Sequence, residues 1–265
     1  MNCPALEEYD AVLMDLDGVL WVEGRPIDEN LRVARMLAEE ELLVIVTNNS
    51  TRSRRTYARM LSRILGSRLQ PDRIVTSGYS ASRLLRRVKG STRVFVVGEE
   101  GLVEELVALG HEVLSASEAR EAEAVVVGLD RNLAYSKLEA ALKALEVGAL
   151  FVATNRDHAL PGRDGMKPGA GAIVAALEVA AGRKANYTAG KPERWMLEAA
   201  LEAAGKPKKP IVVGDRLDTD AEMALRFGLP AVIVGTGVTR VEEVGGSRKK
   251  ELVVVRSLEE LCRRG

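Results

Sequence analysis

Short runs of β-branched and other apolar residues recur along the chain, and this pattern constrains the fold more than any other feature. The runs cover residues 11–14, 42–46, 74–76, 94–97, 125–127, 150–153, 211–213, 231–234 and 252–255. Runs this continuous are typical of strands buried on both faces of a parallel sheet. Amphipathic stretches such as 31–40, 138–145 and 195–204 lie between them. This alternation of strands and helices predicts a doubly wound α/β fold.

Composition argues against several other classes of protein. The chain has 265 residues, of which 46% are hydrophobic, so it can bury a substantial core. Its 38 basic and 38 acidic residues balance, which argues against a nucleic-acid partner, because such proteins carry a basic surface. No apolar run approaches the length of a membrane span. The opening sequence MNCPALEEYD lacks the basic and apolar parts of a signal peptide. We therefore expect no membrane partner and a cytoplasmic location.

The cysteines and histidines show no metal-binding spacing. Cys3 and Cys262 stand at opposite ends of the chain. One disulfide between them is conceivable, but two reduced thiols fit a cytoplasmic protein better. His111 and His158 are expected to be ordinary surface residues without a catalytic role. A single glutamine, Gln70, and many ion-pairing residues, with more arginine than lysine, are compatible with a thermophilic protein.

Polar residues follow three of the predicted strands at the point where each strand ends. Asp15 and Asp17 follow the first run, the segment 47–50 (Thr-Asn-Asn-Ser) follows the second, and Asp215 follows the run 211–213. In open α/β sheets, ligands bind beyond the carboxyl ends of the strands. The three strand ends therefore predict one shared site.

Carboxylates dominate this predicted site. Asp15 and Asp17 are one residue apart and would share a face of a strand, and Asp215 has Asp218 and Asp220 nearby. Acids this close repel one another unless a cation lies between them or one of them is protonated. Oxygen donors without histidine or cysteine suit Mg²⁺, which also takes substrate phosphates as ligands. The sequence thus predicts a Mg²⁺ cofactor and phosphoryl chemistry.

Neutral and basic residues fit the same chemistry. Thr47 and the Asn48 amide can donate to phosphate oxygens, and Lys191 can supply a compensating cation. An aspartate can act as the nucleophile and form an aspartyl-phosphate. Each residue taken alone has a structural reading as well. The aspartates, Thr47 and Asn48 can cap helices, and Lys191 can be an ordinary surface lysine.

Four segments resemble, in order, the four motifs of the haloacid dehalogenase (HAD) superfamily. They are residues 15–20, 47–50, 190–192 and 214–220. They are most similar to subfamily IIA, the NagD-like and 4-nitrophenylphosphatase-like phosphatases, which include phosphoglycolate phosphatases and the pyridoxal phosphate phosphatase. A further set is similar to a cap-domain signature of this subfamily: residues 154–157, Pro161, Gly165 and residues 168–171. The resemblance spans about residues 10 to 240.

The resemblance implies a role for most of the aspartates. Asp15 would attack phosphorus and also bind Mg²⁺. Asp17 would protonate the leaving alcohol and then take a proton from water, while its main-chain carbonyl would bind the metal. Asp215 would be the third metal ligand from the protein, and Asp220 would orient metal-bound water. Asp218 receives no role.

The resemblance also implies how the phosphoryl group is held. Thr47, Asn48 and Asn49 would bind it, and Lys191 would neutralise both the nucleophile and the phosphate. Residues 21–24 stand where the superfamily has a short mobile flap.

Subfamily IIA inserts an α/β cap of the C2 type between the second and third motifs. The resemblance therefore implies a catalytic core of residues 1–88 plus 185–265 and a cap domain of residues 89–184. In such enzymes the cap touches the leaving group of the substrate. Homodimers formed through the cap are common in the group.

The stretch 155–158 is the candidate substrate contact of the cap, through Asn155 and Arg156 in particular. Many members of the subfamily have proline where Arg156 stands. An arginine that faced the site would favour an anionic leaving group such as glycolate, whereas one that faced solvent would have no effect on the substrate.

Together these features predict a Mg²⁺-dependent phosphomonoesterase that hydrolyses a small organic phosphate through an aspartyl-phosphate. p-Nitrophenyl phosphate is the generic substrate; phosphoglycolate, glycerol phosphate, sugar phosphates, nucleotides and pyridoxal phosphate are open as natural ones. A phosphotransferase with the same intermediate is the alternative enzyme. A receiver-like phospho-aspartate module is a non-catalytic alternative, although Asp17 supplies an acid and base that a long-lived switch should lack. A catalytically idle scaffold is a third reading.

Overall fold

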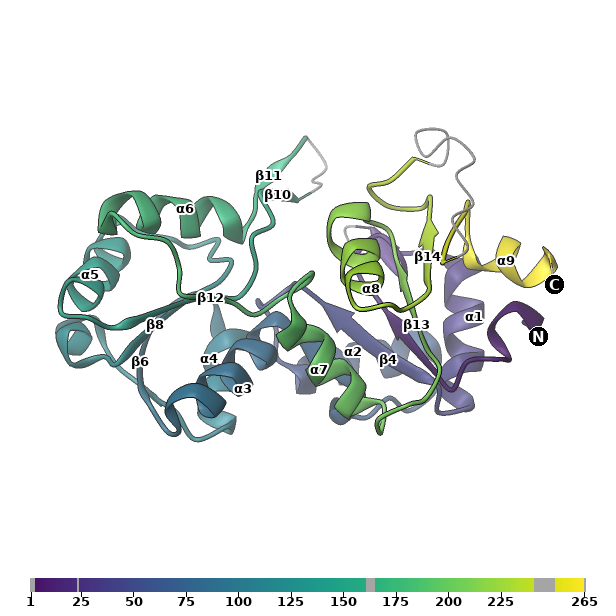
Figure 1. Cartoon of the computed structure of the whole chain (residues 1–265), viewed down its shortest axis with the longest axis horizontal. Helices are drawn as coiled ribbons and strands as arrows, with labels where there is room; N and C mark the ends of the chain where they lie inside the picture. Colours follow the sequence, from purple (N-terminus) through teal and green to yellow (C-terminus); the bar gives the residue numbers. More distant parts are fainter. Residues whose placement is uncertain (1–2, 23, 161–164, 241–250, 265) are drawn as a thin grey trace. The chain divides into compact units, whose positions relative to one another are not determined.

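The computed structural model describes residues 3–22, 24–160, 165–240 and 251–264. The chain divides into two compact units (Figure 1). The first unit comprises Met1–Thr47, Arg55–Val75 and Leu197–Gly265, and the second comprises Asn48–Arg54 and Thr76–Met196. Each unit is built around a parallel sheet of its own.

A six-stranded parallel sheet forms the centre of the first unit, with the strand order β15-β14-β13-β1-β4-β5. Its strands are β1 (Ala11–Met14), β4 (Leu43–Thr47), β5 (Ile74–Thr76), β13 (Pro210–Gly214), β14 (Ala231–Val234) and β15 (Leu252–Val255). Strand β1 pairs with β13 in the register Val12↔Ile211 and with β4 in the register Leu13↔Val44. Every residue of β1, β4 and β13 is buried, as continuous apolar runs predict.

The helices of this unit are α1 (Asp28–Glu39), α8 (Glu222–Arg226), α9 (Leu258–Arg264) and most of α2 (Arg54–Leu65) and α7 (Arg194–Ala203). Its short helical turns are η1 (Pro4–Leu6), η2 (Pro71–Arg73) and η4 (Leu217–Ala221). Leu37 of α1, Leu61 of α2 and Leu258 of α9 join one buried cluster with alternate strand residues such as Met14 and Ile45. Alternate residues of a strand share one face, so this cluster fills one side of the sheet. A hairpin of β2 (Trp21–Val22) and β3 (Arg25–Pro26) follows β1.

The second unit contains a five-stranded parallel sheet with the order β12-β9-β8-β6-β7. Its strands are β6 (Arg93–Val97), β7 (Glu112–Val113), β8 (Ala124–Val127), β9 (Leu150–Ala153) and β12 (Tyr187–Thr188). Its helices are α3 (Ser77–Lys89), α4 (Glu100–Ala108), the turn η3 (Ala116–Glu121), α5 (Tyr135–Glu146) and α6 (Ala170–Ala181). A short hairpin, β10 (Ala159–Leu160) and β11 (Lys167–Pro168), precedes α6.

Helices lie on both faces of this second sheet (Figure 1). Alternate strand residues such as Val125 and Phe151 form one cluster with side chains of α5 and α6. The intervening residues, such as Val126 and Val152, form a second cluster with α3 and α4. The unit is thus a three-layer α/β sandwich, in which both faces of each central strand are apolar.

The structure confirms the predicted α/β class with its two parallel sheets. The runs predicted at 11–14, 74–76, 150–153, 231–234 and 252–255 are strands with those bounds. The boundaries expected from the resemblance, at residues 89 and 184, stay a prediction. Within the described residues, no helix is long and apolar enough to cross a membrane.

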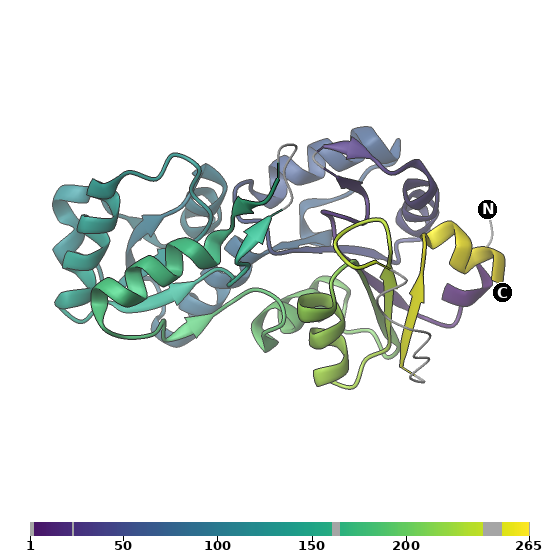
Figure 2. The same ribbon diagram turned by 90° about the horizontal axis from the view of Figure 1, so that it is seen from above.

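The expectation of two reduced thiols is wrong, because Cys3 and Cys262 form a disulfide. Helix α9, near one end of the chain, packs against the turn η1, near the other end, and against helix α1 (Figure 2). Both cysteines are buried in that contact. The pairing depends on where the two termini meet in space, which residue spacing alone does not reveal.

The expectation that both histidines lie at the surface is also wrong for His111, which is buried. Its Nε2 atom lies 3.1 Å from the carbonyl oxygen of Ser82 in helix α3. Burial lowers the pKa of His111, because desolvation disfavours the charged imidazolium. His158 is exposed, as expected.

Candidate active site

Three of the predicted site residues stand at the same edge of the sheet in the first unit. Strand β1 lies between β13 and β4. Asp15 directly follows β1, Thr47 is the last residue of β4, and Asp215 directly follows β13. The main-chain N–H of Asp15 donates to the carbonyl oxygen of Val213 at 2.8 Å, which extends the strand pairing by one residue. Three adjacent parallel strands therefore bring two carboxylates and a hydroxyl to one edge.

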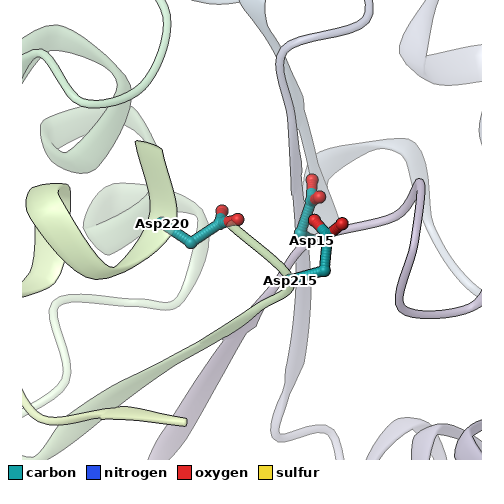
Figure 3. A group of neighbouring side chains, drawn as sticks. All are labelled: Asp15, Asp215 and Asp220. Carbon is teal, nitrogen blue, oxygen red and sulfur yellow. The ribbon is translucent and has the colours of Figure 1, made fainter. Parts of the chain in front are cut away.

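Asp220 joins the two carboxylates at this edge (Figure 3). It comes from the helical turn η4, which follows β13. Asp15, Asp215 and Asp220 each offer one carboxylate oxygen, and these oxygens all lie within 4.8 Å of one another. All three side chains are buried. Asp218, on the same turn, is instead exposed and forms an ion pair with Arg216 at 2.7 Å.

This donor set fits a hard divalent cation. Three buried carboxylates this close repel one another strongly, and a cation bound between them offsets this electrostatic repulsion. The set consists of oxygen atoms alone, which is the ligand preference of Mg²⁺ and Ca²⁺. The triad could therefore hold a metal ion.

Main-chain atoms fix the carboxylate of Asp215. The N–H of Val238 donates to Asp215 Oδ2 at 2.6 Å. A Cβ atom at Gly18 would lie 2.3 Å from the same oxygen, and one at Gly237 would lie 2.0 Å from it. Gly18 also has a φ of +85°, which residues with a side chain rarely adopt. Glycine is therefore required at both positions for the backbone to approach Asp215.

Asp17 lies outside the carboxylate triad. Its side chain is exposed, and the indole Nε1 of Trp21 donates to its Oδ1 at 2.8 Å. The main-chain N–H of Gly18 donates to the carbonyl of Trp21 at 2.7 Å, so the β2–β3 hairpin folds back on this loop. Glu23 of the expected flap lies outside the described residues, as does Pro161 of the expected cap signature.

The second unit contains the other group of predicted residues. The side chain of Asn48 accepts from the main-chain N–H of Lys191 at 2.8 Å and donates to the Lys191 carbonyl at 3.2 Å. It also donates to Asp157 Oδ1 at 3.1 Å. The main-chain carbonyl of Asn48 accepts from Asn155 Nδ2 at 2.7 Å. The structure thus brings Asn48, Asn155 and Lys191 together, and all three are buried.

Asn49 forms a local turn. Its Oδ1 accepts from the main-chain N–H of Thr51 at 3.0 Å and from the Thr51 hydroxyl at 2.7 Å. A side-chain oxygen bonded two residues ahead is the geometry of an Asx turn, which shapes the loop after β4.

Arg156 is engaged by an ion pair. Its guanidinium donates to Glu178 Oε1 of helix α6 at 2.7 Å and to the Thr188 hydroxyl at 3.0 Å. Glu178 is buried and also accepts from Lys184 Nζ at 2.9 Å. The hydrogen bond from Arg156, more than any other contact, lowers the pKa of Glu178 to about 2. This ion pair fastens the segment that contains Arg156 to α6.

One part of the site was missed by reasoning from the sequence. The loop Gly235-Thr236-Gly237-Val238 follows strand β14 and supplies the N–H that binds Asp215. The sequence does contain a pattern that could have predicted this loop. Glycines and a threonine directly follow the apolar run 231–234, in the same way that polar residues follow β1 and β4.

Two family models match the chain. One, described as haloacid dehalogenase-like hydrolase, matches residues 12–112. The other, described as HAD-hydrolase-like, matches residues 188–261. These stretches include the loops that carry Asp15, Asn48, Lys191 and Asp215.

Curated relatives are similar over most of the chain. A D-glycerol 3-phosphate phosphatase from Mycobacterium tuberculosis is 39% identical over 88% of this chain, which spans 64% of that relative's length. A glycerol-3-phosphate phosphatase from Gallus gallus is 35% identical, over 93% of this chain and 86% of the length of that relative.

Solved structures of phosphatases are also similar to this chain. A p-nitrophenyl phosphatase from Archaeoglobus fulgidus is 33% identical, with a TM-score of 0.86 over 97% of this chain and 99% of that one. A glycerol phosphate phosphatase from Mycobacterium tuberculosis, in complex with magnesium, is 34% identical, with a TM-score of 0.84 over 98% of this chain and 78% of that one. The chain therefore belongs to the haloacid dehalogenase-like hydrolases, in subfamily IIA with the p-nitrophenylphosphatase-like and chronophin-like enzymes, and its two parallel sheets are the core and the C2-type cap of that group.

Proposed function

We propose that this protein is a Mg²⁺-dependent phosphatase that hydrolyses small phosphate monoesters through an aspartyl-phosphate on Asp15. The observation that carries the proposal is the buried triad formed by Asp15 and Asp215, at the ends of adjacent strands, and Asp220 of the turn η4. The exposed carboxylate of Asp17, two residues from the nucleophile, adds a group that can move protons. Relatives that are named phosphatases of glycerol phosphate and p-nitrophenyl phosphate support the substrate class.

Three residues would hold the metal ion. Asp15 and Asp215 would bind Mg²⁺ through their side chains, and Asp17 would bind it through its main-chain carbonyl. Asp220 lies within 4.8 Å of both carboxylates, and we assign it to the water molecules of the ion. A bound Mg²⁺ supplies positive charge that offsets the phosphate and the carboxylates.

The first half of the reaction is carried by the two aspartates that follow β1. A carboxylate oxygen of Asp15 attacks phosphorus, and the bond between phosphorus and the ester oxygen breaks. The carboxylic acid of Asp17 gives its proton to that oxygen, so the product leaves as a neutral alcohol. The phosphoryl group is then attached to Asp15.

The second half reverses the role of Asp17. Its carboxylate takes a proton from a water molecule as that water attacks the phosphorus of the aspartyl-phosphate. The bond to Asp15 breaks, inorganic phosphate is released, and Asp15 is free for another cycle. Because Asp17 can take a proton from the attacking water, hydrolysis is favoured over transfer of the phosphoryl group to another acceptor.

Polar residues around the phosphoryl group would stabilise its charge. We assign this work to the Thr47 hydroxyl, the Asn48 amide, Asn49 and the Lys191 ammonium. Because the Asn48 side chain bonds both the N–H and the carbonyl of Lys191, it would also set the position of that lysine. We assign contacts with the leaving group to Asn155 and Arg156, and the ion pair of Arg156 with Glu178 limits how far that side chain could reach.

A panel of phosphomonoesters tests the proposal. Glycerol 3-phosphate, p-nitrophenyl phosphate, phosphoglycolate and a hexose phosphate would be assayed for phosphate release, with Mg²⁺ and with EDTA. We expect turnover that requires Mg²⁺ and falls by at least about a thousandfold in Asp15→Asn, because an amide cannot act as the nucleophile.

Asp218→Asn is the matched control. Asp218 lies on the same turn as Asp220 but pairs with Arg216 at the surface, so its loss should leave turnover close to that of the wild type. Absence of turnover on every ester, p-nitrophenyl phosphate included, would contradict the proposal and point to a binding module.

A further inference from the structure

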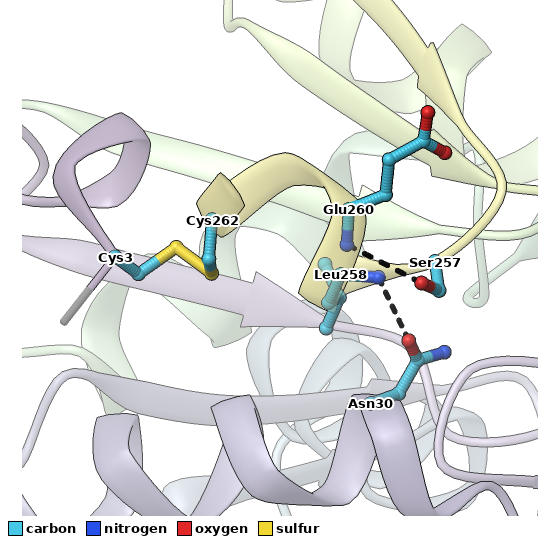
Figure 4. Close-up of a disulfide and its surroundings, with 6 residues drawn as sticks. All are labelled: Cys3, Asn30, Ser257, Leu258, Glu260 and Cys262. Carbon is cyan, nitrogen blue, oxygen red and sulfur yellow. Dashed lines mark hydrogen bonds between the residues drawn. A yellow bond between two sulfur atoms is a disulfide. The ribbon is translucent and has the colours of Figure 1, made fainter. Parts of the chain in front are cut away.

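Asn30 is a buried polar residue that belongs to none of the sequence motifs (Figure 4). It lies in the first turn of helix α1 in the first unit, and its exposed fraction is 0%. A buried amide costs free energy unless its donors and its acceptor find partners. The structure provides a partner for each of them.

Three segments that are distant in the sequence bind this one side chain. The main-chain N–H of Leu258, at the start of α9, donates to Asn30 Oδ1 at 2.8 Å. Asn30 Nδ2 donates to the carbonyl oxygen of Val19 at 2.8 Å and to the Thr236 hydroxyl at 3.1 Å. Leu258 N–H can only donate and the Val19 carbonyl can only accept, so these partners fix the orientation of the amide.

The hydrogen bonds continue from Asn30 toward the active site. The Thr236 hydroxyl, which accepts from Asn30, donates in turn to the carbonyl oxygen of Gly18 at 2.7 Å. Asn30 therefore binds the 18–19 segment directly through Val19 and again through Thr236. Linked bonds of this kind reinforce one another in a buried environment.

Both segments held by Asn30 contact the Asp215 carboxylate. Gly18 and Gly237, each next to a residue bound in this network, approach Asp215 Oδ2 so closely that neither has room for a Cβ atom. Val238, two residues after Thr236, donates its N–H to the same oxygen. The backbone that surrounds Asp215 is thus tied to a single amide in α1.

We infer that Asn30 is a positioning residue for the metal site: it holds the 18–19 and 236–238 segments against each other and so fixes the orientation of the Asp215 carboxylate. This inference rests on the proposed function, because it takes Asp215 as a Mg²⁺ ligand. Without the Asn30 side chain, the Val19 carbonyl and the Leu258 N–H lose their buried partner, and the two segments can separate. The Asp215 carboxylate then has more than one orientation, and affinity for the metal falls.

Direct titration with Mg²⁺ tests the inference without any substrate. The dissociation constant for Mg²⁺ would be measured by isothermal calorimetry on the full chain for the wild type, Asn30→Ala and Thr236→Val. Loss of a group that orients a metal ligand typically weakens binding by tenfold to a hundredfold. We expect at least a tenfold weaker affinity in Asn30→Ala and a smaller loss in Thr236→Val. In the double variant the two losses should combine to less than their product, because both remove one network.

Kinetics separate positioning from a general loss of structure. In Asn30→Ala, activity should recover toward the wild-type kcat as Mg²⁺ is raised, while KM for p-nitrophenyl phosphate at saturating Mg²⁺ stays near the wild-type value. A variant that merely folds poorly would not be rescued in this way. Asn186→Ala is the control, because it removes a side-chain bond to the main-chain N–H of Phe151 at 2.8 Å in the second unit. Its Mg²⁺ affinity should be unchanged.

The remaining outcomes are decisive as well. Wild-type Mg²⁺ affinity in a folded Asn30→Ala would overturn the inference. If Asn30→Ala does not fold, Thr236→Val provides the test, because this variant retains the bond between Asn30 and α9. Unchanged Mg²⁺ affinity in Thr236→Val would then overturn the inference. A wild type that binds Mg²⁺ but hydrolyses no ester would refute the proposed function. The Mg²⁺ titration of the variants would then still test the inference about Asn30. A wild type that binds no Mg²⁺ would refute both.

Discussion

The Asp215 carboxylate is bound by main-chain atoms on one side and faces two other carboxylates on the other. The Val238 N–H holds one of its oxygens at 2.6 Å. Gly18 and Gly237 pack against that same oxygen. Main-chain groups in a folded loop have far less freedom than a side chain does, so they impose one orientation on the carboxylate.

Gly237→Ala tests this close fit. The added Cβ atom would lie 2.0 Å from Asp215 Oδ2 and 2.6 Å from its Cγ, so the carboxylate or the loop must shift. We expect kcat/KM for p-nitrophenyl phosphate to fall at least about tenfold, with a higher Mg²⁺ requirement. Gly78→Ala is the control, because its Cβ would meet Leu102 at an ordinary 3.4 Å. Wild-type Mg²⁺ dependence in Gly237→Ala would show that the loop absorbs the methyl group.

Some residues of the site could be predicted from the sequence and others could not. Asp15 and Thr47 directly follow an apolar run and Asp215 stands two residues after one, so the predicted strand ends located all three. Asn30 gives no such signal. Its partners lie 11, 206 and 228 residues away in the sequence, and only the folded chain brings them together.

At the scale of single elements, helix α6 shows how one buried charge organises its surroundings. Glu178 accepts from Arg156, from Lys184 and from the main-chain N–H of Ala185 at 2.9 Å. These contacts lower the pKa of Glu178 to about 2, with the hydrogen bond from Arg156 as the largest cause. The charged form of Glu178 is therefore strongly favoured in the folded state.

Acidification should destabilise the second unit through this residue. A carboxyl group whose pKa is lowered by folding contributes stability above its ordinary pKa of 4.5, and this contribution is lost as the pH falls toward 2. We expect the free energy of unfolding to fall by about 2 kcal/mol between pH 5 and pH 2. This value allows for solvent screening, because the side chains of Arg156 and Lys184 are 45% and 82% exposed.

Urea unfolding at a series of pH values measures this loss. In Glu178→Gln the pH dependence between 5 and 2 should be shallower than in the wild type, because the titrating group is gone. Glu139→Gln is the control, since Glu139 forms an exposed ion pair with Lys143, and such pairs contribute little. Parallel pH profiles for the wild type and Glu178→Gln would contradict the assignment.

The elements themselves were predicted with uneven success, for a physical reason. Continuous apolar runs marked β1, β9, β14 and β15 with the predicted bounds. In β1 and β14 every residue is buried, whereas the edge strand β15 exposes Val253. The hairpins β2–β3 and β10–β11 were not predicted as strands. Each strand in them has two residues, and β3 and β11 are exposed, so no apolar alternation marks them.

At the scale of the whole molecule, the disulfide between Cys3 and Cys262 constrains nearly the entire chain. The two cysteines are separated by 259 residues in the sequence. Closing so long a loop lowers the entropy of the unfolded chain, with an expected stabilisation of up to about 5 kcal/mol. We therefore expect a reductant to lower the melting temperature of the wild type by several degrees.

The paired variant Cys3→Ser/Cys262→Ser provides the control. It should melt near the temperature of the reduced wild type and show no response to the reductant. A thiol assay on the unfolded, unreduced protein gives a second measurement, for which we expect no free thiol. Detection of two free thiols per chain would contradict the disulfide and support the reduced cysteines expected for a cytoplasmic protein.

The same bond has a consequence for how the polypeptide can be cut. The first unit is assembled from the stretches Met1–Thr47, Arg55–Val75 and Leu197–Gly265, and most of the second unit lies between the last two of these. With residues 3 and 262 joined, the backbone and the sulfur bridge form a closed covalent ring. One proteolytic nick anywhere between them opens the ring but releases no fragment. Even if a protease removed the middle of the second unit, the disulfide would still join the amino-terminal and carboxyl-terminal parts of the catalytic core. The two parts would therefore migrate as a single band on a non-reducing gel.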